Sequence, residues 1–389
     1  MDNFEFILPT KFYFGKDEDK RVGEICKSHG ATKIMIIHYG DFVKETGLFG
    51  RIADSITNAG ISWVEIDGVR PNPRVDLVRK CITQARDEGV DFLLAIGGGS
   101  VIDTAKATGV GMNYDGDVWD LYEGTGDASK MTPVGVVLTI PASGSESSDG
   151  SVIMNQETHS KRGYGREFMR PAFAVMNPEL TYTLPPFQTA AGGFDIMAHV
   201  MERYFTKTKH CDVTDELCEG VLRAMVKNIP VVMKEPQNYE ARAEIMWAGS
   251  MAHSGLLGVG RKEDWGSHEL GHALSAFYDI NHGATLSIIF PAWMHYVYKL
   301  CPQKFAQFAE RVWNVEKSED NEWMALEGIK RMKEFCRGLG LPVRFEDAGI
   351  PPDKIEEMAG HCTLNDTVAA GGIKKLYKQD CINIYRGAL

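Results

Sequence analysis

Two residues that can bind a metal ion lie one helical turn apart in the second half of the sequence. Asp195 and His199 are four residues apart in the segment GGFDIMAHVMERYF. Because residues four apart leave the same face of a helix, both side chains can reach a single ion. The spacing is also common by chance, and an exposed helical pair without a ligand is the structural alternative.

Three of the 11 histidines gather further along the chain, within SHELGHALSAFYDINHG. These are His268, His272 and His282. One carboxylate and three imidazoles hold a divalent ion and leave a coordination position open, as a catalytic rather than a structural site requires. The residue types therefore predict a metal centre in this half of the chain.

The string His268-Glu-Leu-Gly-His272 also satisfies the H-E-x-x-H pattern of zinc metalloproteases. Peptide hydrolysis does not need the nucleotide-like first half described next, which weighs against this alternative. A metalloprotease stays open as a rival class.

A glycine-rich turn lies in the first half of the sequence. The apolar run 92–96 leads into Gly97-Gly98-Gly99-Ser100 and then into a stretch of helical character. Glycines bring backbone N–H groups close to an anion, and a helix N-terminus adds partial positive charge, so a diphosphate fits this turn. The alternative is a plain strand-to-helix turn with Ser100 as the helix cap.

A second turn rich in hydroxyl groups, at residues 139–146, follows another apolar run. Neither turn matches the full dinucleotide fingerprint or a Walker loop. Two such turns at strand ends nevertheless favour nucleotide binding at that edge of a sheet.

The elements that would position these residues divide the chain into two domains. Strands predicted at residues 33–38, 61–66, 92–96, 134–139 and 172–176 alternate with helical stretches, which indicates a parallel sheet with flanking helices. After Pro185-Pro186 only amphipathic patterns follow, at residues 213–227, 241–252 and 325–339. We expect an α/β dinucleotide-binding domain over residues 1–185 and an all-helical metal-binding domain over residues 186–389.

The composition excludes several classes of protein. A formal net charge of −11 argues against nucleic acid and anionic membrane partners. The N-terminus does not resemble a signal peptide, and no stretch reaches the roughly 18 apolar residues of a membrane span, so a cytoplasmic location is expected. The 8 cysteines form no C-x-x-C pair and are expected to be reduced, mostly buried thiols.

At these residues the chain resembles the iron-containing alcohol dehydrogenase family, and most closely its butanol dehydrogenase-like branch. The similarity covers nearly the full length. It rests on the segments PNPRVDLV (71–78), GGGSVIDTAK (97–106), ASGSE (142–146), NPELTYTLPP (177–186), DIMAHVMERYF (195–205) and GRKEDWGSHELGHALSAFYDINHGATLSIIFPAWMHYV (260–297).

The resemblance implies a role for each matching residue. Asp195, His199, His268 and His282 would bind Fe²⁺ or Zn²⁺, and His272 would lie near the nicotinamide as a proton relay, unless it is only a hydrogen-bonded wall residue. The implied cofactor contacts are Asn72, Gly98, Gly99, Ser100, Asp103, Thr139, Ser143, Ser148 and Lys161.

One segment departs from the NADP-using members of this branch, which carry Gly-Gly-Gly-Ser after the first strand. This chain has His38-Tyr39-Gly40-Asp41 there. A carboxylate at Asp41 accepts hydrogen bonds from ribose hydroxyls and repels a 2′-phosphate, which predicts NAD(H) over NADP(H). The alternative is that Asp41 caps an exposed helix before Val43.

The function that follows is a metal-dependent alcohol dehydrogenase or aldehyde reductase acting on a small primary alcohol or aldehyde. In this hypothesis the metal activates the substrate oxygen and the nicotinamide carries the hydride. The resemblance suggests a homodimer. An NAD- and metal-dependent lyase of the dehydroquinate synthase type and a non-catalytic dinucleotide-binding protein stay open as alternatives.

Overall fold

The computed structural model describes residues 1–389, which form two compact units. Ile7–Thr183 make up the first unit, and Leu184–Leu389 together with Met1–Phe6 make up the second. The predicted domain boundary after residue 185 lies close to this division. The prediction differs for residues 1–6, which belong to the helical unit. Asp2 donates its backbone N–H to the backbone oxygen of Gly260 at 2.8 Å, a long-range contact within that unit.

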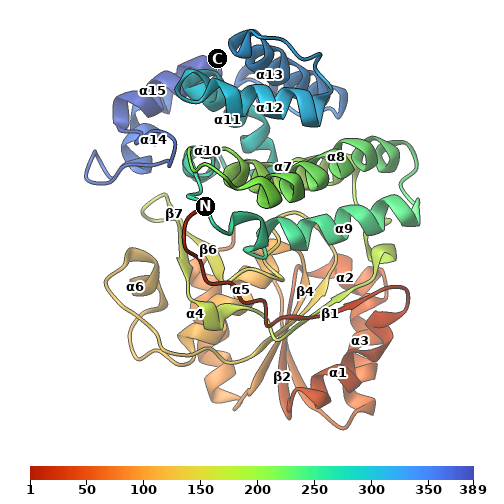
Figure 1. Ribbon diagram of the computed structural model, residues 1–389. Coiled ribbons are helices and arrows are strands. Elements are labelled where there is room, and N and C mark those ends of the chain that lie inside the picture. The colour runs from red at the N-terminus through yellow and green to blue at the C-terminus, as the bar shows by residue number, and fades with distance from the viewer. The chain divides into compact units, whose positions relative to one another are not determined.

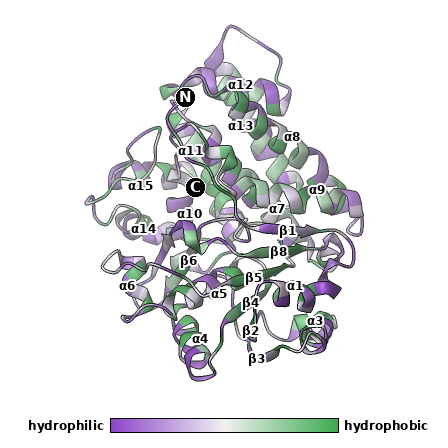
Figure 2. Cartoon of the chain, turned by 60° about the horizontal axis from the view of Figure 1, so that its bottom comes forward, coloured by the Kyte–Doolittle hydropathy of each residue, from purple (hydrophilic) through white to green (hydrophobic).

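The first unit contains a parallel sheet of six strands (Figure 1), and Figure 2 labels them in their order in the sheet, β1-β8-β5-β4-β2-β3. All neighbouring strands in this sheet run parallel. The predicted parallel α/β fold is confirmed. In the order of the sheet, the strands are β1 (Lys11–Phe14), β8 (Phe173–Met176), β5 (Val134–Leu138), β4 (Phe92–Gly97), β2 (Lys33–His38) and β3 (Ser62–Ile66).

The central strands are recognisable in the sequence because they are apolar throughout. Every residue of β4 and β5 is buried, and both strands are green in the hydropathy view of Figure 2. A parallel sheet is covered on both faces, so its central strands need uninterrupted apolar runs. The helices of this unit are α1 (Val22–Ser28), α2 (Asp41–Glu45), α3 (Leu48–Asn58), α4 (Val75–Asp87), α5 (Gly99–Gly111) and α6 (Val118–Glu123).

The sequence analysis misses three strands of this unit. β1 is a short edge strand that pairs only with β8, so neither its length nor its burial produces a clear pattern. β6 (Gly150–Asn155) and β7 (Ser160–Gly165) form an antiparallel hairpin. In β7 only one residue, Tyr164, is buried, which is why the alternation of a strand is not visible in SKRGYG.

The second unit is helical, as predicted. It contains no strand, and its only β-type pairing is an isolated bridge between Ala370 and Leu376. The predicted helices at 213–227 and 241–252 fall within α8 and α9, and the one predicted at 325–339 extends one residue beyond the end of α13. The helices are α7 (Pro186–Tyr204), α8 (Asp212–Lys234), α9 (Tyr239–His253), α10 (Gly266–Tyr278), α11 (His282–Val297), α12 (Pro302–Trp313), α13 (Asn321–Gly338), α14 (Ile355–Cys362) and α15 (Lys378–Gly387).

Helix α7 lies inside the helical unit, where it packs against α8, α9 and α11. All its residues from Thr189 to Tyr204 are buried. A helix buried on all sides is normally apolar. Its polar side chains, among them Asp195, His199 and Glu202, must therefore find partners within the protein.

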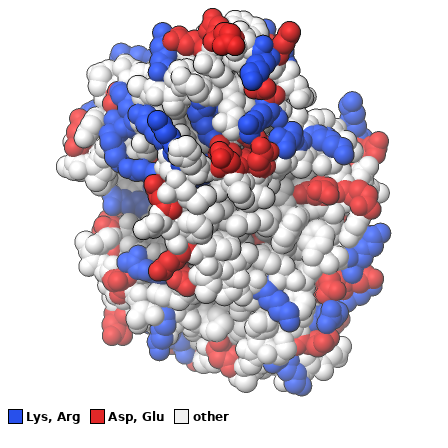
Figure 3. Space-filling view, viewed as in Figure 1, with Lys and Arg blue, Asp and Glu red and all other residues white.

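Charge and cysteines are distributed as in an ordinary globular protein. Lysines and arginines are interspersed with acidic residues on the face shown in Figure 3. All cysteines are free thiols, and all except Cys301 are buried. No helix combines the length and the apolar character that crossing a membrane requires.

A buried lysine anchors α5 to the start of the β6–β7 hairpin. Lys106 is completely buried, and its Nζ donates to the backbone oxygens of Ser148 at 2.8 Å and Gly150 at 2.9 Å. Burial lowers the pKa of Lys106 to about 8, against the opposing attraction of Asp103 and other acids. The ammonium is therefore held by hydrogen bonds at the cost of losing hydration.

This pKa predicts a pH dependence of stability. Above about pH 8 the unfolded chain binds more protons at Lys106 than the folded chain does, so the free energy of unfolding rises with pH through this group. Between about pH 7.5 and 9.5 we expect the wild type to gain about 2 kcal/mol relative to Lys106→Met, measured by urea unfolding. The exposed Lys80→Met is the control and should run parallel to the wild type; a Lys106→Met curve that also runs parallel contradicts the prediction.

Candidate metal centre and nucleotide-binding turns

Residues from three helices converge in the helical unit. Asp195 lies in the middle of α7, His268 lies in the first turn of α10, and His282 is the first residue of α11. One potential ligand atom from each lies within 4.8 Å of the others, so these three residues can hold one metal ion. Asp195 and His268 are buried and His282 is partly exposed, with its side chain 22% accessible.

The predicted fourth ligand, His199, lies beside this group but is not part of it. Its Nδ1 is 3.2 Å from Asp195 Oδ1, and its ring centroid is 4.5 Å from that of His268. Asp195 Oδ1 is also 3.8 Å from His282 Nε2. The structure therefore brings all four predicted ligands into one neighbourhood, with three of them already grouped around a common point.

Hydrogen bonds determine which nitrogen of two imidazoles carries the proton. His199 Nδ1 lies 2.8 Å from the backbone oxygen of Asp195, and His268 Nδ1 lies 2.7 Å from Glu202 Oε1. A carbonyl or carboxylate oxygen only accepts, so Nδ1 is the donor in both rings. The lone pair then lies on Nε2, the nitrogen that can bind a metal.

Glu202 is a functional candidate that the sequence analysis misses. It is completely buried on α7, and its Oε1 accepts hydrogen bonds from the backbone N–H and Nδ1 of His268 and from Ser267 Oγ. Burial raises the pKa of Glu202 to about 7, while the hydrogen bonds from Ser267, His268 and Trp265 oppose that rise. Its place was visible in the spacing, because residues 195, 199 and 202 share one face of a helix.

The donor set fits a divalent metal. Asp195 Oδ1 is buried and accepts no hydrogen bond, which is costly for a carboxylate unless a cation lies near it. One carboxylate oxygen and imidazole nitrogens are ligands that suit Fe²⁺ and Zn²⁺ alike. The residues present therefore match the predicted metal centre.

His272 lies on the partly exposed side of this group. Its ring centroid is 5.0 Å from that of His282 and 6.2 Å from that of His268. His272 is partly exposed, whereas His268, one turn earlier on α10, is buried. It is not a member of the three-residue group, and its predicted role as a proton relay stays a prediction.

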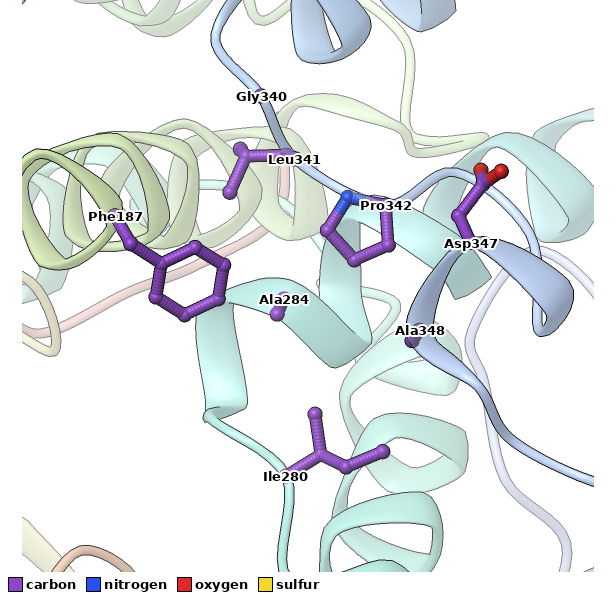
Figure 4. Close-up of a pocket in the computed structure, with 8 residues that line it drawn as sticks. All are labelled: Phe187, Ile280, Ala284, Gly340, Leu341, Pro342, Asp347 and Ala348. Atoms are coloured by element: carbon purple, nitrogen blue, oxygen red, sulfur yellow. The ribbon is translucent and has the colours of Figure 1, made fainter.

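A separate pocket of about 340 Å³ lies in the helical unit around the first turn of α11 (Figure 4). Asp347 is its only charged lining residue, and this carboxylate accepts the backbone N–H of Val343 at 2.9 Å. None of the lining residues is a predicted ligand. The residues are Phe187, Ile280, Ala284, Gly340, Leu341, Pro342, Asp347 and Ala348.

In the α/β unit, the two predicted nucleotide turns pack directly against each other. A Cβ atom on Gly98 would lie 2.8 Å from Ile140 Cβ, and one on Gly99 would lie 2.3 Å from Ser143 Oγ. Thr139 donates its backbone N–H to Gly97 at 3.0 Å. The glycines are therefore needed for the approach of the second turn, whether or not a diphosphate also binds.

Several predicted cofactor contacts serve first to hold the turns. Asp103 is partly buried and accepts hydrogen bonds from Ser145 Oγ at 2.6 Å and from Val152 N at 2.9 Å. Ser148 contacts Lys106 through its hydroxyl and its backbone oxygen. Lys161 Nζ donates to Asn72 Oδ1 at 3.0 Å.

The helix-capping roles considered for Ser100 and Asp41 are wrong. Gly98, not Ser100, occupies the N-cap of α5, and no side chain caps that helix. Gly40 likewise occupies the N-cap of α2, where Asp41 is the first helical residue and caps nothing. Asp41 is exposed. Its carboxylate is thus at the surface directly after β2 and its turn.

The family follows from comparison with known sequences. The family model for iron-containing alcohol dehydrogenase matches residues 9–178, and the model for the C-terminal part of the Fe-containing alcohol dehydrogenase family matches residues 189–389. The chain belongs to the iron-containing alcohol dehydrogenase family. The resemblance noted in the sequence is confirmed.

Relatives in this family are similar along the whole chain. NADH-dependent butanol dehydrogenase A of Clostridium acetobutylicum is 38% identical over 387 residues, 99% of each chain. The NADPH-dependent aldehyde reductase YqhD of Escherichia coli is 36% identical over 358 residues, 91% of each chain.

A solved structure agrees with these sequences. The crystal structure of NADH-dependent butanol dehydrogenase A from Thermotoga maritima matches with a TM-score of 0.97 at 36% identity, covering 100% of this chain and 99% of that one. Together, these matches favour the dehydrogenase hypothesis over a lyase or a metalloprotease.

The close contact between the turns at residues 97–100 and 139–146 predicts that a methyl group added at Gly98 lowers the stability of the protein. We expect Gly98→Ala to lower the free energy of unfolding by about 1–3 kcal/mol, because its Cβ has no room beside Ile140. Urea unfolding measures the change. Gly50→Ala in α3 is the matched control: nothing lies within 4 Å of its added Cβ, so it should be neutral or slightly stabilising. Equal stabilities of the two variants would contradict the packing argument.

Proposed function

We propose that this chain is a metal-dependent alcohol dehydrogenase or aldehyde reductase that transfers a hydride between NAD(H) and a small primary alcohol or aldehyde. The observation that carries the proposal is the grouping of Asp195, His268 and His282, in which Asp195 Oδ1 is buried and has no hydrogen bond. Membership of the iron-containing alcohol dehydrogenase family supports the same chemistry.

The metal would be Fe²⁺ or Zn²⁺, held by Asp195, His199, His268 and His282. When bound, it would supply a Lewis acid that activates an alcohol oxygen or polarises an aldehyde carbonyl. Asp195 provides the negative charge of the donor set, and the imidazoles provide neutral nitrogens. Since His282 is the most exposed of these side chains, a substrate would reach the group from the side of His282.

His272 is the proposed proton carrier. Alcohol oxidation releases a proton apart from the hydride, and aldehyde reduction takes one up. An imidazole can both accept and release a proton near neutral pH. The partial exposure of His272 and its position next to His282 suit a route between the substrate oxygen and solvent.

The preference for NAD(H) rests on charges after β2 and β3. Lys44 is the basic residue in this region, and its Nζ is already paired with Glu65 at 2.5 Å. That hydrogen bond raises the pKa of Lys44, and the charges of Asp67 and Asp41 act in the same direction. An NADP 2′-phosphate would meet these carboxylates and would have to compete for Lys44. Relatives of both cofactor types exist, so this preference is a property to be tested in this chain.

The metal centre predicts loss of activity when its ligands are removed. The protein is stripped with a chelator, reloaded with Fe²⁺ or Zn²⁺, and followed by the absorbance of NADH with butanal as substrate. We expect an Asp195→Ala, His199→Ala double variant to bind less than one metal per chain and to lose at least about 100-fold in kcat/KM.

His295→Ala is the matched control for this experiment. His295 is exposed on α11 and stacks near Tyr298 rather than near the ligands, so its loss should leave metal content and turnover unchanged. Unchanged turnover in the double variant, or full activity without any metal, would refute the proposal that the reaction depends on a metal.

The cofactor preference predicts a change in selectivity for Asp41→Ala. Removing this carboxylate should raise the ratio of kcat/KM with NADPH to kcat/KM with NADH by about 10-fold, which corresponds to about 1.4 kcal/mol. Asp54→Ala, which removes an exposed carboxylate from α3, is the control and should leave the ratio unchanged. Equal use of NADPH and NADH by the wild type would refute the role of Asp41.

The predicted homodimer and the cytoplasmic location stay predictions.

A further inference from the structure

The beginning of α10 is attached to α7 through a single carboxylate. The two oxygens of Glu202 accept hydrogen bonds from different residues. Oε2 accepts the backbone N–H of Trp265 at 2.8 Å. Oε1 accepts the backbone N–H of His268 at 3.0 Å and the hydroxyl of Ser267 at 2.5 Å. These donors lie in the residue before α10 and in its first turn. Four donors, counting His268 Nδ1, therefore fix the orientation of the Glu202 carboxylate.

The fourth donor has a different consequence from the other three. His268 Nδ1 lies 2.7 Å from Glu202 Oε1, so the ring can place only its Nε2 toward the other ligands. A carboxylate that accepts from a metal-binding histidine fixes the tautomer and the ring orientation and raises the basicity of the coordinating nitrogen. Backbone donors and Ser267 cannot provide this effect.

We infer that Glu202 is a positioning residue for the metal centre, acting through His268 to present its Nε2 to the ion. This inference rests on the proposed function, because it assumes that His268 is a ligand. Glu202 has no lysine or arginine partner, and hydrogen bonds from the first turn of α10 and from the His268 ring stabilise its carboxylate instead.

The backbone at Trp265 supports an imposed geometry. Trp265 has φ 66°, a left-handed conformation that is uncommon for a bulky residue. Glu202 holds its N–H, Glu263 accepts its indole Nε1 at 2.5 Å, and Arg203 Cζ lies 4.7 Å from its ring centroid. The residue that leads into α10 is therefore held in a strained conformation by α7 and its neighbours. This fixes the start of α10 and with it the position of His268.

The test compares Glu202→Gln with a matched variant at the same helix end. Asp264 is also buried and also accepts backbone N–H groups here, from Gly266 at 2.8 Å and Gly372 at 2.8 Å, but it forms no hydrogen bond with His268. Asp264→Asn makes the same chemical change without touching the imidazole. Both variants are measured for Zn²⁺ affinity by competition with a chromogenic chelator and for the visible absorption spectrum of bound Co²⁺.

We expect Glu202→Gln to weaken Zn²⁺ binding by about 10–100-fold and to shift the Co²⁺ spectrum, whereas Asp264→Asn stays within about 3-fold of the wild type with an unchanged spectrum. Equal weakening in both variants would mean that Glu202 only supports the helix, and wild-type affinity in Glu202→Gln would overturn the inference outright. Zn²⁺ binding that is equally tight in wild type and Asp195→Ala would instead refute the metal centre itself.

A measurement on the wild type covers the case in which Glu202→Gln does not fold. Nitrogen-15 NMR of histidine-labelled, metal-free protein reports the tautomer of each ring, with His268 assigned by its absence in His268→Gln. We expect His268 to carry its proton on Nδ1. A ring protonated on Nε2 alone would overturn the inference.

Discussion

The burial of acidic side chains on α7 is the constraint from which the organisation of the helical unit follows. Asp195 and Glu202 lie on a helix whose residues are buried from Thr189 onward. A charge in such a place must be paired, hydrogen-bonded or neutralised. Glu202 meets this demand by capturing the start of α10, and Asp195 meets it through its closeness to imidazoles and, in our proposal, to a divalent ion. The positions of α10 and α11 are thus tied to polar atoms as well as to the apolar core.

Much of this arrangement could be predicted from the sequence, because the relevant signals are local. The spacing of Asp195 and His199 predicts a shared helix face, and the apolar runs of β4 and β5 predict buried strands. Glu202 was equally visible by spacing, but a lone glutamate on a helix is usually a solvated side chain. Its role depends on Trp265 and His268, which are more than 60 residues away, and no local pattern encodes that contact.

The remaining differences also arise from long-range contacts. The first six residues join the helical unit through bonds to loops near residues 209 and 260, which a prediction by sequence position cannot anticipate. Gly98 was interpreted as a place for an anion to approach the backbone. The structure adds a second demand, since Ile140 occupies the space that a side chain would need. The approach of an anion and the packing of Ile140 each require a glycine at this position. The sequence indicates the first requirement, and only the structure reveals the second.

Buried carboxylates in the helical unit are stabilised in two different ways. Asp215 is paired with Lys304 and Arg261, and although burial opposes it, these partners lower the pKa of Asp215. Near α10 the pattern is different. Burial raises the pKa of Glu202 to about 7 and that of Asp264 to about 6, and neither carboxylate pairs with a lysine or arginine.

Asp195, close to Glu202 on the same helix, also has only histidines within ion-pairing distance. A fold that pairs one buried acid with two cations has basic residues available for the purpose. No lysine or arginine forms an ion pair with Asp195, Glu202 or Asp264, so positive charge near these carboxylates must come from other groups. Helix N-terminal N–H groups supply part of it, and a divalent ion among the imidazoles would supply the rest at the point where Asp195 Oδ1 accepts no hydrogen bond.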